Sequence, residues 1–320
     1  MIEHYLEAFK RIEKSFPAII NDCIHLDFKQ HSGHIVVGSI IHGNETGSLP
    51  ATIEIIQKLI AKKILYGGKI SFFLGNKKAA LQNKRFIDHD LNRCFAEQNN
   101  TTLSHEKKRA LDLKNLLITA DVFIDFHQTT RPSLESFYIF AMHKQSYLWA
   151  RAIGSSRIFV TRRSSKPYSI EGMCSDEYVR SLNKPGITLE LGQQGINQYS
   201  TEVCLKAIIN TIKTMDLIKL KNRNIIQLAK KNQDFKILEM KYSEKFHNNN
   251  TKLLIELKNL EKVTKNQKLG ELNKEHFFYA PFEGHILFPQ YPERNQEQFV
   301  IEPLPTYIYS LATAFKGFPK

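Results

Sequence analysis

Three polar residues have the types and spacing of a zinc site. His42 and Glu45 form an H-x-x-E pair in HGNETG, directly after the apolar run IVVGSII, and His127 follows the apolar run DVFIDF. Two histidines and one glutamate bind zinc while leaving its fourth position open, which is the catalytic pattern. Taken alone, the H-x-x-E pair is more typical of a solvated polar loop.

Glu190 is a candidate general base. It lies inside the apolar run ITLELG, where an ionised carboxylate is costly unless it is paired or used. Near a metal-activated water, such a carboxylate accepts a proton and later returns it. A buried ion pair explains the same residue equally well. Asp125, two residues before His127, is placed either to orient an imidazole or to occupy a turn.

A basic segment over residues 76–95 offers Arg85, Asp90, Asn92 and Arg93. An arginine beside an asparagine suits capture of a substrate carboxylate by charge-assisted hydrogen bonds, and a separate arginine can polarise a scissile carbonyl. Without the zinc residues, a solvated basic loop would be the simpler interpretation.

The elements that must position these residues indicate an α/β domain. Apolar runs predict strands at 35–41, 69–74, 121–126, 136–141, 157–160 and 187–191. Helical patterns occupy about 3–14, the segment after Ser48, and about 201–219. Strands that alternate with helices favour a largely parallel sheet, and ligands bind at the carboxyl edge of such sheets. His42 and His127 would both lie at that edge.

The character of the sequence changes past residue 221. Lys/Asn-rich sequence with short alternating stretches, such as FKILEMKY, KLLIELKN and GHILFP, follows this point. We predict a catalytic α/β domain over residues 1–221 and a smaller β domain over residues 222–320 that caps the active site.

Composition restricts the class of protein. The 320 residues are 42% hydrophobic and 24% charged, which allows a large core and excludes disorder as the main state. The sequence has no apolar run of membrane-spanning length, and its N-terminus lacks the pattern of a secretory signal. Four cysteines without a CxxC pair fit a reducing compartment. We expect a cytoplasmic protein with no membrane partner.

The net charge of +13 is unevenly distributed. Residues 213–274 hold 15 Lys/Arg and 7 Asp/Glu, a net of +8. A nucleic-acid-binding protein would use this segment, but aromatic residues there are sparse and no nucleic-acid-binding motif occurs. We expect no nucleic-acid partner and keep that class as the less favoured alternative.

Six motifs together resemble the succinylglutamate desuccinylase and aspartoacylase family. They are HGNET at 42–46, LGN at 74–76, R-x4-D-L-N-R-x-F at 85–95, D-F-H at 125–127, Arg180 ten residues before Glu190, and TLELG. The resemblance covers the first 200 residues firmly and the remainder in general shape. It implies a zinc-carboxypeptidase-like mixed, largely parallel sheet flanked by helices, with a smaller C-terminal β domain.

The resemblance also implies a role for each matching residue. The zinc ligands, for one Zn²⁺ per chain, are matched by His42, Glu45 and His127. Glu190 matches the water-activating carboxylate and Arg85 the carbonyl-polarising arginine. The residues that match substrate-binding positions are Asn92, Arg93 and Arg180.

The implied reaction is hydrolysis of the amide bond of a small anionic substrate, an N-acylated acidic amino acid. DLNR and the TT after DFHQ resemble aspartoacylases, whereas TLELG and R-x-S-L at 131–134 resemble desuccinylases. N-succinylglutamate and N-acetylaspartate therefore both stay open as substrates. Aspartoacylases also use a C-terminal tyrosine, which Tyr309 or Tyr307 would match.

One other enzyme class shares these features. Metallocarboxypeptidases have the H-x-x-E pair, a distant histidine and an Asn-Arg pair, so a peptidase is the alternative enzyme. A C-terminal domain that covers the cleft would exclude peptides and favour small substrates. The sequence is also compatible with a homo-oligomer.

Overall fold

The computed structural model describes residues 2–96, 104–162, 172–296, 300–301 and 304–315. The strands up to residue 245 are β1 (Cys23–Asp27), β2 (His34–Ser39), β3 (Lys69–Leu74), β4 (Val122–Thr129), β5 (Phe137–Ile139), β6 (Ile158–Thr161), β7 (Gly186–Gln193) and β8 (Lys236–Lys245). The later strands are β9 (Lys252–Leu253), β10 (Lys262–Val263), β11 (Lys268–Glu271), β12 (Phe277–Tyr279), β13 (Gly284–Leu287) and β14 (Tyr307–Ala314).

The helices lie mostly in the first 230 residues. They are α1 (Ile2–Glu13), α2 (Leu49–Ile60), α3 (Lys77–Leu81), the 3₁₀ turn η1 (Leu91–Arg93), α4 (His105–Leu117), α5 (Lys144–Ile153), α6 (Ser175–Ser181), α7 (Gln198–Lys219) and α8 (Ile225–Ala229). None of the helices in the described ranges is both long and apolar enough to cross a membrane.

An eleven-stranded mixed sheet forms the body of the molecule, in the order β1-β3-β2-β4-β7-β5-β6-β8-β14-β13-β10. Its centre is parallel, because β2 pairs with β3 and β4, and β4 pairs with β7. β1 and β5 join this centre in the antiparallel sense. A second, antiparallel sheet has the order β12-β11-β9. The predicted α/β fold with a largely parallel sheet is confirmed.

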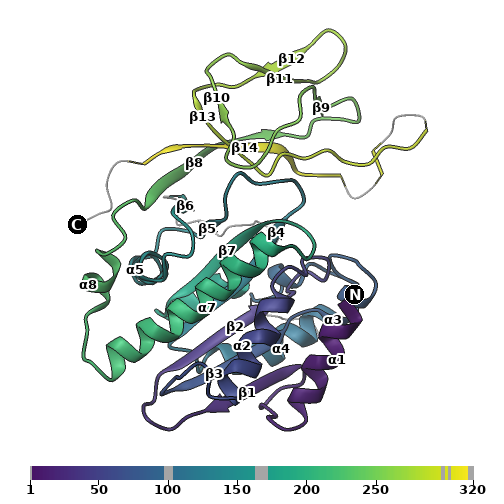
Figure 1. Ribbon diagram of the computed structural model, residues 1–320. Helices are drawn as coiled ribbons and strands as arrows, with labels where there is room; N and C mark the ends of the chain where they lie inside the picture. The colour runs from purple at the N-terminus through teal and green to yellow at the C-terminus, as the bar shows by residue number, and fades with distance from the viewer. Residues whose placement is uncertain (1, 97–103, 163–171, 297–299, 302–303, 316–320) are drawn as a thin grey trace.

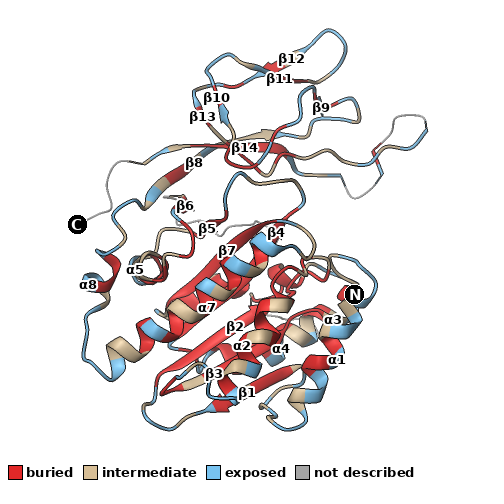
Figure 2. Ribbon diagram, in the orientation of Figure 1, coloured by how far each residue is buried: buried red, intermediate tan, exposed pale blue. Residues whose placement is uncertain are grey.

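Helices cover both faces of the central strands, which explains why these strands are apolar on both sides (Figures 1 and 2). On one face Ile35 and Val37 of β2 pack in a core with α1, α2, α5 and α7. On the other face Val36 packs in a core with α4 and α6. The carboxyl ends of the parallel strands meet at one edge. The loop that carries His42 and Glu45 begins there, after β2.

The strands after residue 221, β8 to β14, lie in the upper part of Figure 1, whereas α8 lies lower, near α5. β8 pairs with β6 in parallel and with β14 in the antiparallel sense, so the large sheet continues into this part of the chain. A separate apolar core there includes Leu269, Phe278 and Tyr309. The boundary between residues 221 and 222 stays a prediction.

Candidate active site

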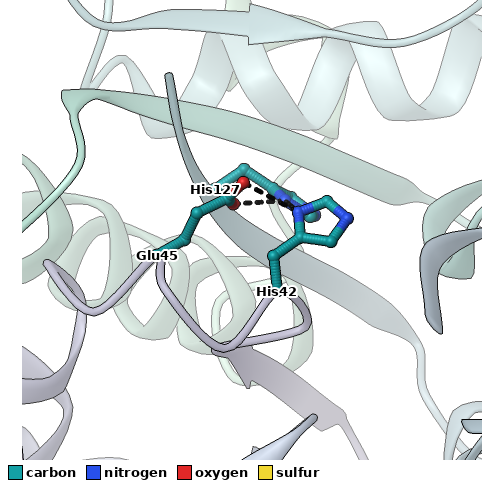
Figure 3. Close-up of side chains that lie close together, drawn as sticks. All are labelled: His42, Glu45 and His127. Carbon is teal, nitrogen blue, oxygen red and sulfur yellow. Dashed lines mark hydrogen bonds and ion pairs between the residues drawn. The ribbon is translucent and has the colours of Figure 1, made fainter. Parts of the chain in front are cut away.

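His42, Glu45 and His127 meet at the carboxyl edge of the sheet (Figure 3). His42 and Glu45 lie in the loop between β2 and α2, and His127 lies on β4. Ile40, at the start of the loop, has φ = 52°, a strained conformation for a β-branched residue and one that gathers at functional sites. Gly43 allows close packing here, since a Cβ would lie 2.3 Å from the Ala80 nitrogen.

The ligating atoms of this group face one another. Glu45 Oε1 lies 2.8 Å from His42 Nδ1, and its Oε2 lies 2.8 Å from His127 Nδ1. The two Nδ1 atoms are 3.1 Å apart, and all three side chains are buried. Two imidazole nitrogens and a carboxylate that converge out of water are a donor set that fits a divalent metal such as zinc.

Each histidine has a second carboxylate at its outer nitrogen. His42 Nε2 lies 3.0 Å from Asp90 Oδ1, and His127 Nε2 lies 3.0 Å from Asp125 Oδ2. Asp125 also accepts a hydrogen bond from the Ser175 hydroxyl. Such carboxylates fix the tautomer and orientation of a metal-binding imidazole, leaving the inner nitrogen as the ligand.

Opposite charges stabilise one another within this group. Burial favours neutral Glu45, but His42 and His127 outweigh it and hold the pKa of Glu45 well below its usual range. Burial likewise works against protonated His127, while Asp125 and Glu45 raise its pKa well above the usual value. The arrangement therefore stabilises positive charge at its centre, as a metal-binding site must.

Glu190 lies beside this group on β7. It is the register partner of His127 in the parallel pair β4–β7, and its Oε2 atom is buried without a hydrogen-bond partner. Burial, together with the negative charge of Glu45, raises the pKa of Glu190 to about 8. A buried carboxylate with an unused oxygen and a near-neutral pKa is suited to proton transfer.

Arg85 reaches the group from the loop after α3. Its Nη1 donates to Glu45 Oε1 at 3.1 Å, and its Nε and Nη2 donate to Asp90 Oδ2 at 3.2 and 3.0 Å. The guanidinium is partly exposed, so it can meet a substrate as well as these carboxylates. The structure thus places Arg85 beside the His42–Glu45–His127 group, and its role in polarising a carbonyl stays a prediction.

Asn92 and Arg93 also lie near this edge, on η1. Asn92 Nδ2 is 3.4 Å from His127 Nε2, and Asn92 Oδ1 accepts from the Ser175 backbone N–H at 2.9 Å. Arg93 Nη1 donates to the Asn92 carbonyl at 2.8 Å and approaches Cys174 Sγ at 3.4 Å. Their role in binding substrate stays a prediction.

Among the described residues, Arg180 makes no hydrogen bond or ion pair with His42, Glu45 or His127, and its role in binding substrate stays a prediction. Arg180 is buried on α6, where it pairs with Asp176 and donates to the carbonyl of Gly186 at 3.0 Å. Gly186 begins β7, four residues before Glu190, or roughly 13 Å along a strand. Tyr309 lies in the core of the C-terminal part, stacked on Phe278.

Two polar residues near the site were not predicted from the sequence. Glu106 on α4 accepts hydrogen bonds from the backbone N–H groups of residues 87–89, and so holds the loop between Arg85 and Asp90. Gln128, next to His127, accepts a hydrogen bond from the backbone of Gly47. Their partners are distant in sequence, so local patterns give no signal for them.

Residues 34–216 match one family model, the "Succinylglutamate desuccinylase/Aspartoacylase catalytic domain". The succinylglutamate desuccinylase of Pseudomonas paraeruginosa is 28% identical over 183 residues, which are 53% of this chain and 50% of that protein. The enzyme of the same name from Pseudomonas putida is 25% identical over 305 residues, 87% of this chain and 83% of that protein. The chain spans about half the length of the first relative.

Solved structures share the fold. A succinylglutamate desuccinylase from Vibrio cholerae has a TM-score of 0.67 at 17% identity, covering 92% of this chain and 85% of that chain. A succinylglutamate desuccinylase/aspartoacylase from Rhodobacter sphaeroides has a TM-score of 0.68 at 15% identity, covering 92% and 89%. A product-bound ectoine utilization protein EutE (DoeB) from Ruegeria pomeroyi has a TM-score of 0.64 at 17% identity, covering 91% and 88%.

Proposed function

The chain belongs to the succinylglutamate desuccinylase/aspartoacylase family of deacylases, and from that premise we propose that it hydrolyses the amide bond of an N-acylated acidic amino acid. The observation that carries this proposal is the buried His42–Glu45–His127 group with Glu190 beside it. N-succinylglutamate is the first substrate to test, because the curated relatives described above carry the name succinylglutamate desuccinylase.

We propose that His42, Glu45 and His127 hold one Zn²⁺ per chain. A zinc ion held there supplies Lewis acidity and makes water acidic enough to act as a nucleophile near neutral pH. Asp90 and Asp125 keep the two imidazoles oriented from behind.

Glu190 would move the proton. Its unpartnered Oε2 takes a proton from the attacking water and gives it to the nitrogen of the departing amine. Arg85 would stabilise the negative oxygen of the tetrahedral intermediate, and its partial exposure beside Glu45 supports this role.

Recognition of the acidic amino acid falls to the η1 segment in this proposal. Arg93 supplies a positive charge and Asn92 a polar side chain for a substrate carboxylate. For Arg180 we propose a structural role instead, since its side chain pairs with Asp176, donates to the Gly186 carbonyl and lies over the Phe140 ring.

We further propose that residues 222–320 cap the site. The Asn259 side chain donates to the carbonyl groups of Arg131 and Pro132, and Arg131 lies 4.4 Å over the Tyr291 ring. These contacts attach the C-terminal part to the loop that follows β4, and so to the strand of His127. A capped site would favour small substrates over peptides. The cysteines form no disulfide in the described part of the chain, which fits our proposal of a cytoplasmic protein.

A side-by-side assay tests the proposed function. The zinc-loaded protein is incubated with N-succinylglutamate, N-acetylaspartate, N-acetylglutamate and an N-blocked dipeptide, and the released amine is measured. We expect hydrolysis of at least one acylated acidic amino acid and none of the dipeptide. Cleavage of the dipeptide alone would replace the deacylase proposal with a carboxypeptidase.

A further inference from the structure

We propose that Gln128 is a positioning residue that sets the spacing between the H-x-x-E loop and Glu190. This inference rests on the proposed function, because it concerns groups assigned to that reaction. Gln128 follows His127 on β4 and is only 3% exposed. Its side-chain amide contacts both segments whose spacing matters.

On one side Gln128 holds the H-x-x-E loop. Its Oε1 accepts from the Gly47 backbone N–H at 2.8 Å, and its own backbone N–H donates to Glu45 Oε2 at 3.0 Å. The contact is tight, since a Cβ added to Gly47 would lie 2.3 Å from Gln128 Nε2. Only glycine leaves room for the amide at this position.

On the other side the same amide holds the end of β7. Its Nε2 lies 2.7 Å from the carbonyl oxygen of Gln193, 2.9 Å from that of Gly195 and 3.3 Å from Ser200 Oγ. Its Oε1 also accepts from the Gly195 N–H at 3.2 Å. The amide thus uses its donors and its acceptor, which makes it costly to remove.

The backbone shows why a side chain is needed here. In the β4–β7 ladder, His127 pairs with Glu190, but Thr129 pairs with Gln193, so the register shifts across Gln128. The extra residue on β7 forms a bulge, and Gly192 there has φ = 105°. Bulges interrupt ladder pairing and re-aim neighbouring side chains, often beside active sites. The Gln128 amide supplies hydrogen bonds where the ladder lacks them, directly after Glu190.

The first test variant is Gln128→Met, which keeps the approximate volume of the side chain and removes its hydrogen bonds. We expect kcat for the hydrolysed substrate to fall at least about tenfold, KM to change less than about threefold, and one zinc per chain to remain. A matched control is Asn210→Ala, which removes an amide hydrogen bond of 2.7 Å to the Ile153 carbonyl. The control should lose thermal stability but keep kcat within about twofold.

A double-mutant cycle with Gly47→Ala separates positioning from general stability. Gly47→Ala alone should lower kcat at least about tenfold, because its Cβ displaces the amide. In a Gln128→Ala background the space next to residue 47 is free. Adding Gly47→Ala to Gln128→Ala should therefore lower kcat by less than about twofold. If Gln128→Met does not fold, the kcat and the zinc content of the Gly47→Ala variant are measured instead.

The outcomes separate the two proposals. An inactive wild type without bound zinc would remove the proposed function. A wild type that is active, with Gln128→Met or Gly47→Ala within about twofold of its kcat, would overturn the positioning role alone. Fully additive effects in the cycle, or an equal loss of kcat in Asn210→Ala, would also overturn it.

Discussion

His127 on β4 and Glu190 on β7 are direct register partners at the carboxyl edge of the parallel sheet. Register partners on adjacent strands project their side chains to the same face. A candidate metal ligand and a candidate base are therefore fixed next to each other by backbone pairing. The consequences of this pairing can be measured at each of the residues involved.

Glu190→Gln keeps the shape of the side chain and removes its ability to accept a proton. We expect zinc content and KM to be retained and kcat to fall about 10²-fold or more. The measurement is steady-state kinetics together with metal analysis. Glu239→Gln is the matched control, since Glu239 is also a buried glutamate but lies on β8, and it should keep kcat within about twofold. Near-normal turnover in Glu190→Gln would return Glu190 to a structural role.

Arg93→Ala tests carboxylate recognition. It removes a charge-assisted contact worth about 1.5 to 3 kcal/mol, so kcat/KM for a diacid substrate should fall at least about tenfold. As a charge control, Lys230 and Lys231, both exposed, are changed to Gln. This double variant should change kcat/KM by less than about threefold, and the change should disappear at higher salt. A larger effect of the lysine pair would move the binding site toward the C-terminal segment.

Arg180→Gln tests the structural contacts found for that residue. It leaves the buried Asp176 without its cation, which should lower the free energy of unfolding by about 3 to 5 kcal/mol. KM at a temperature where the variant is folded should change less than about twofold. A stable variant with a KM raised tenfold would instead support substrate binding by Arg180.

His34 predicts a pH dependence of stability. It is buried at the start of β2, with Nε2 2.9 Å from Ser71 Oγ, and burial, aided by His25, lowers its pKa to about 4. The unfolded chain, with a pKa near 6.5, therefore binds the proton first as the pH falls. The contribution of neutral His34 to the free energy of unfolding should be fully present above about pH 6.5. It should fall by roughly 3 kcal/mol as the pH is lowered toward 4.

Denaturant unfolding at several pH values checks this prediction. His34→Gln should flatten the change between about pH 6.5 and pH 4, whereas His276→Gln, at an exposed histidine, should leave it intact. An unchanged pH dependence in His34→Gln would show that other groups cause the loss of stability.

The central strands were predictable because burial on both faces leaves uninterrupted apolar runs. β3 has the predicted bounds, and β4 extends past the expected end to include His127. The sequence did not predict β1. This five-residue edge strand has the polar residues His25 and Asp27 among its apolar ones, and it pairs with the sheet in the antiparallel sense. α4 was also missed, because its sequence HEKKRALDLKNLL shows only a narrow apolar stripe.

The candidate site was predictable where a motif fixes local geometry. The H-x-x-E loop follows β2 and His127 lies near the carboxyl end of β4, and the two meet because these parallel strands end at one edge. Gln128 and Glu106 could not be predicted, since their partners depend on pairing between distant segments. The ten-residue spacing between Arg180 and Glu190 does not predict which side of α6 faces the sheet, and so does not predict the contacts of the Arg180 side chain. That orientation places Arg180 against Gly186.

Metal content is the most direct test of the account, because every assigned role depends on the His42–Glu45–His127 group. Elemental analysis of the purified, zinc-equilibrated protein should find about one zinc per chain, and removal by a chelator should abolish hydrolysis until zinc is returned. His42→Ala and His127→Ala should each lose both the metal and the activity. Full zinc occupancy in both variants would contradict the assignment.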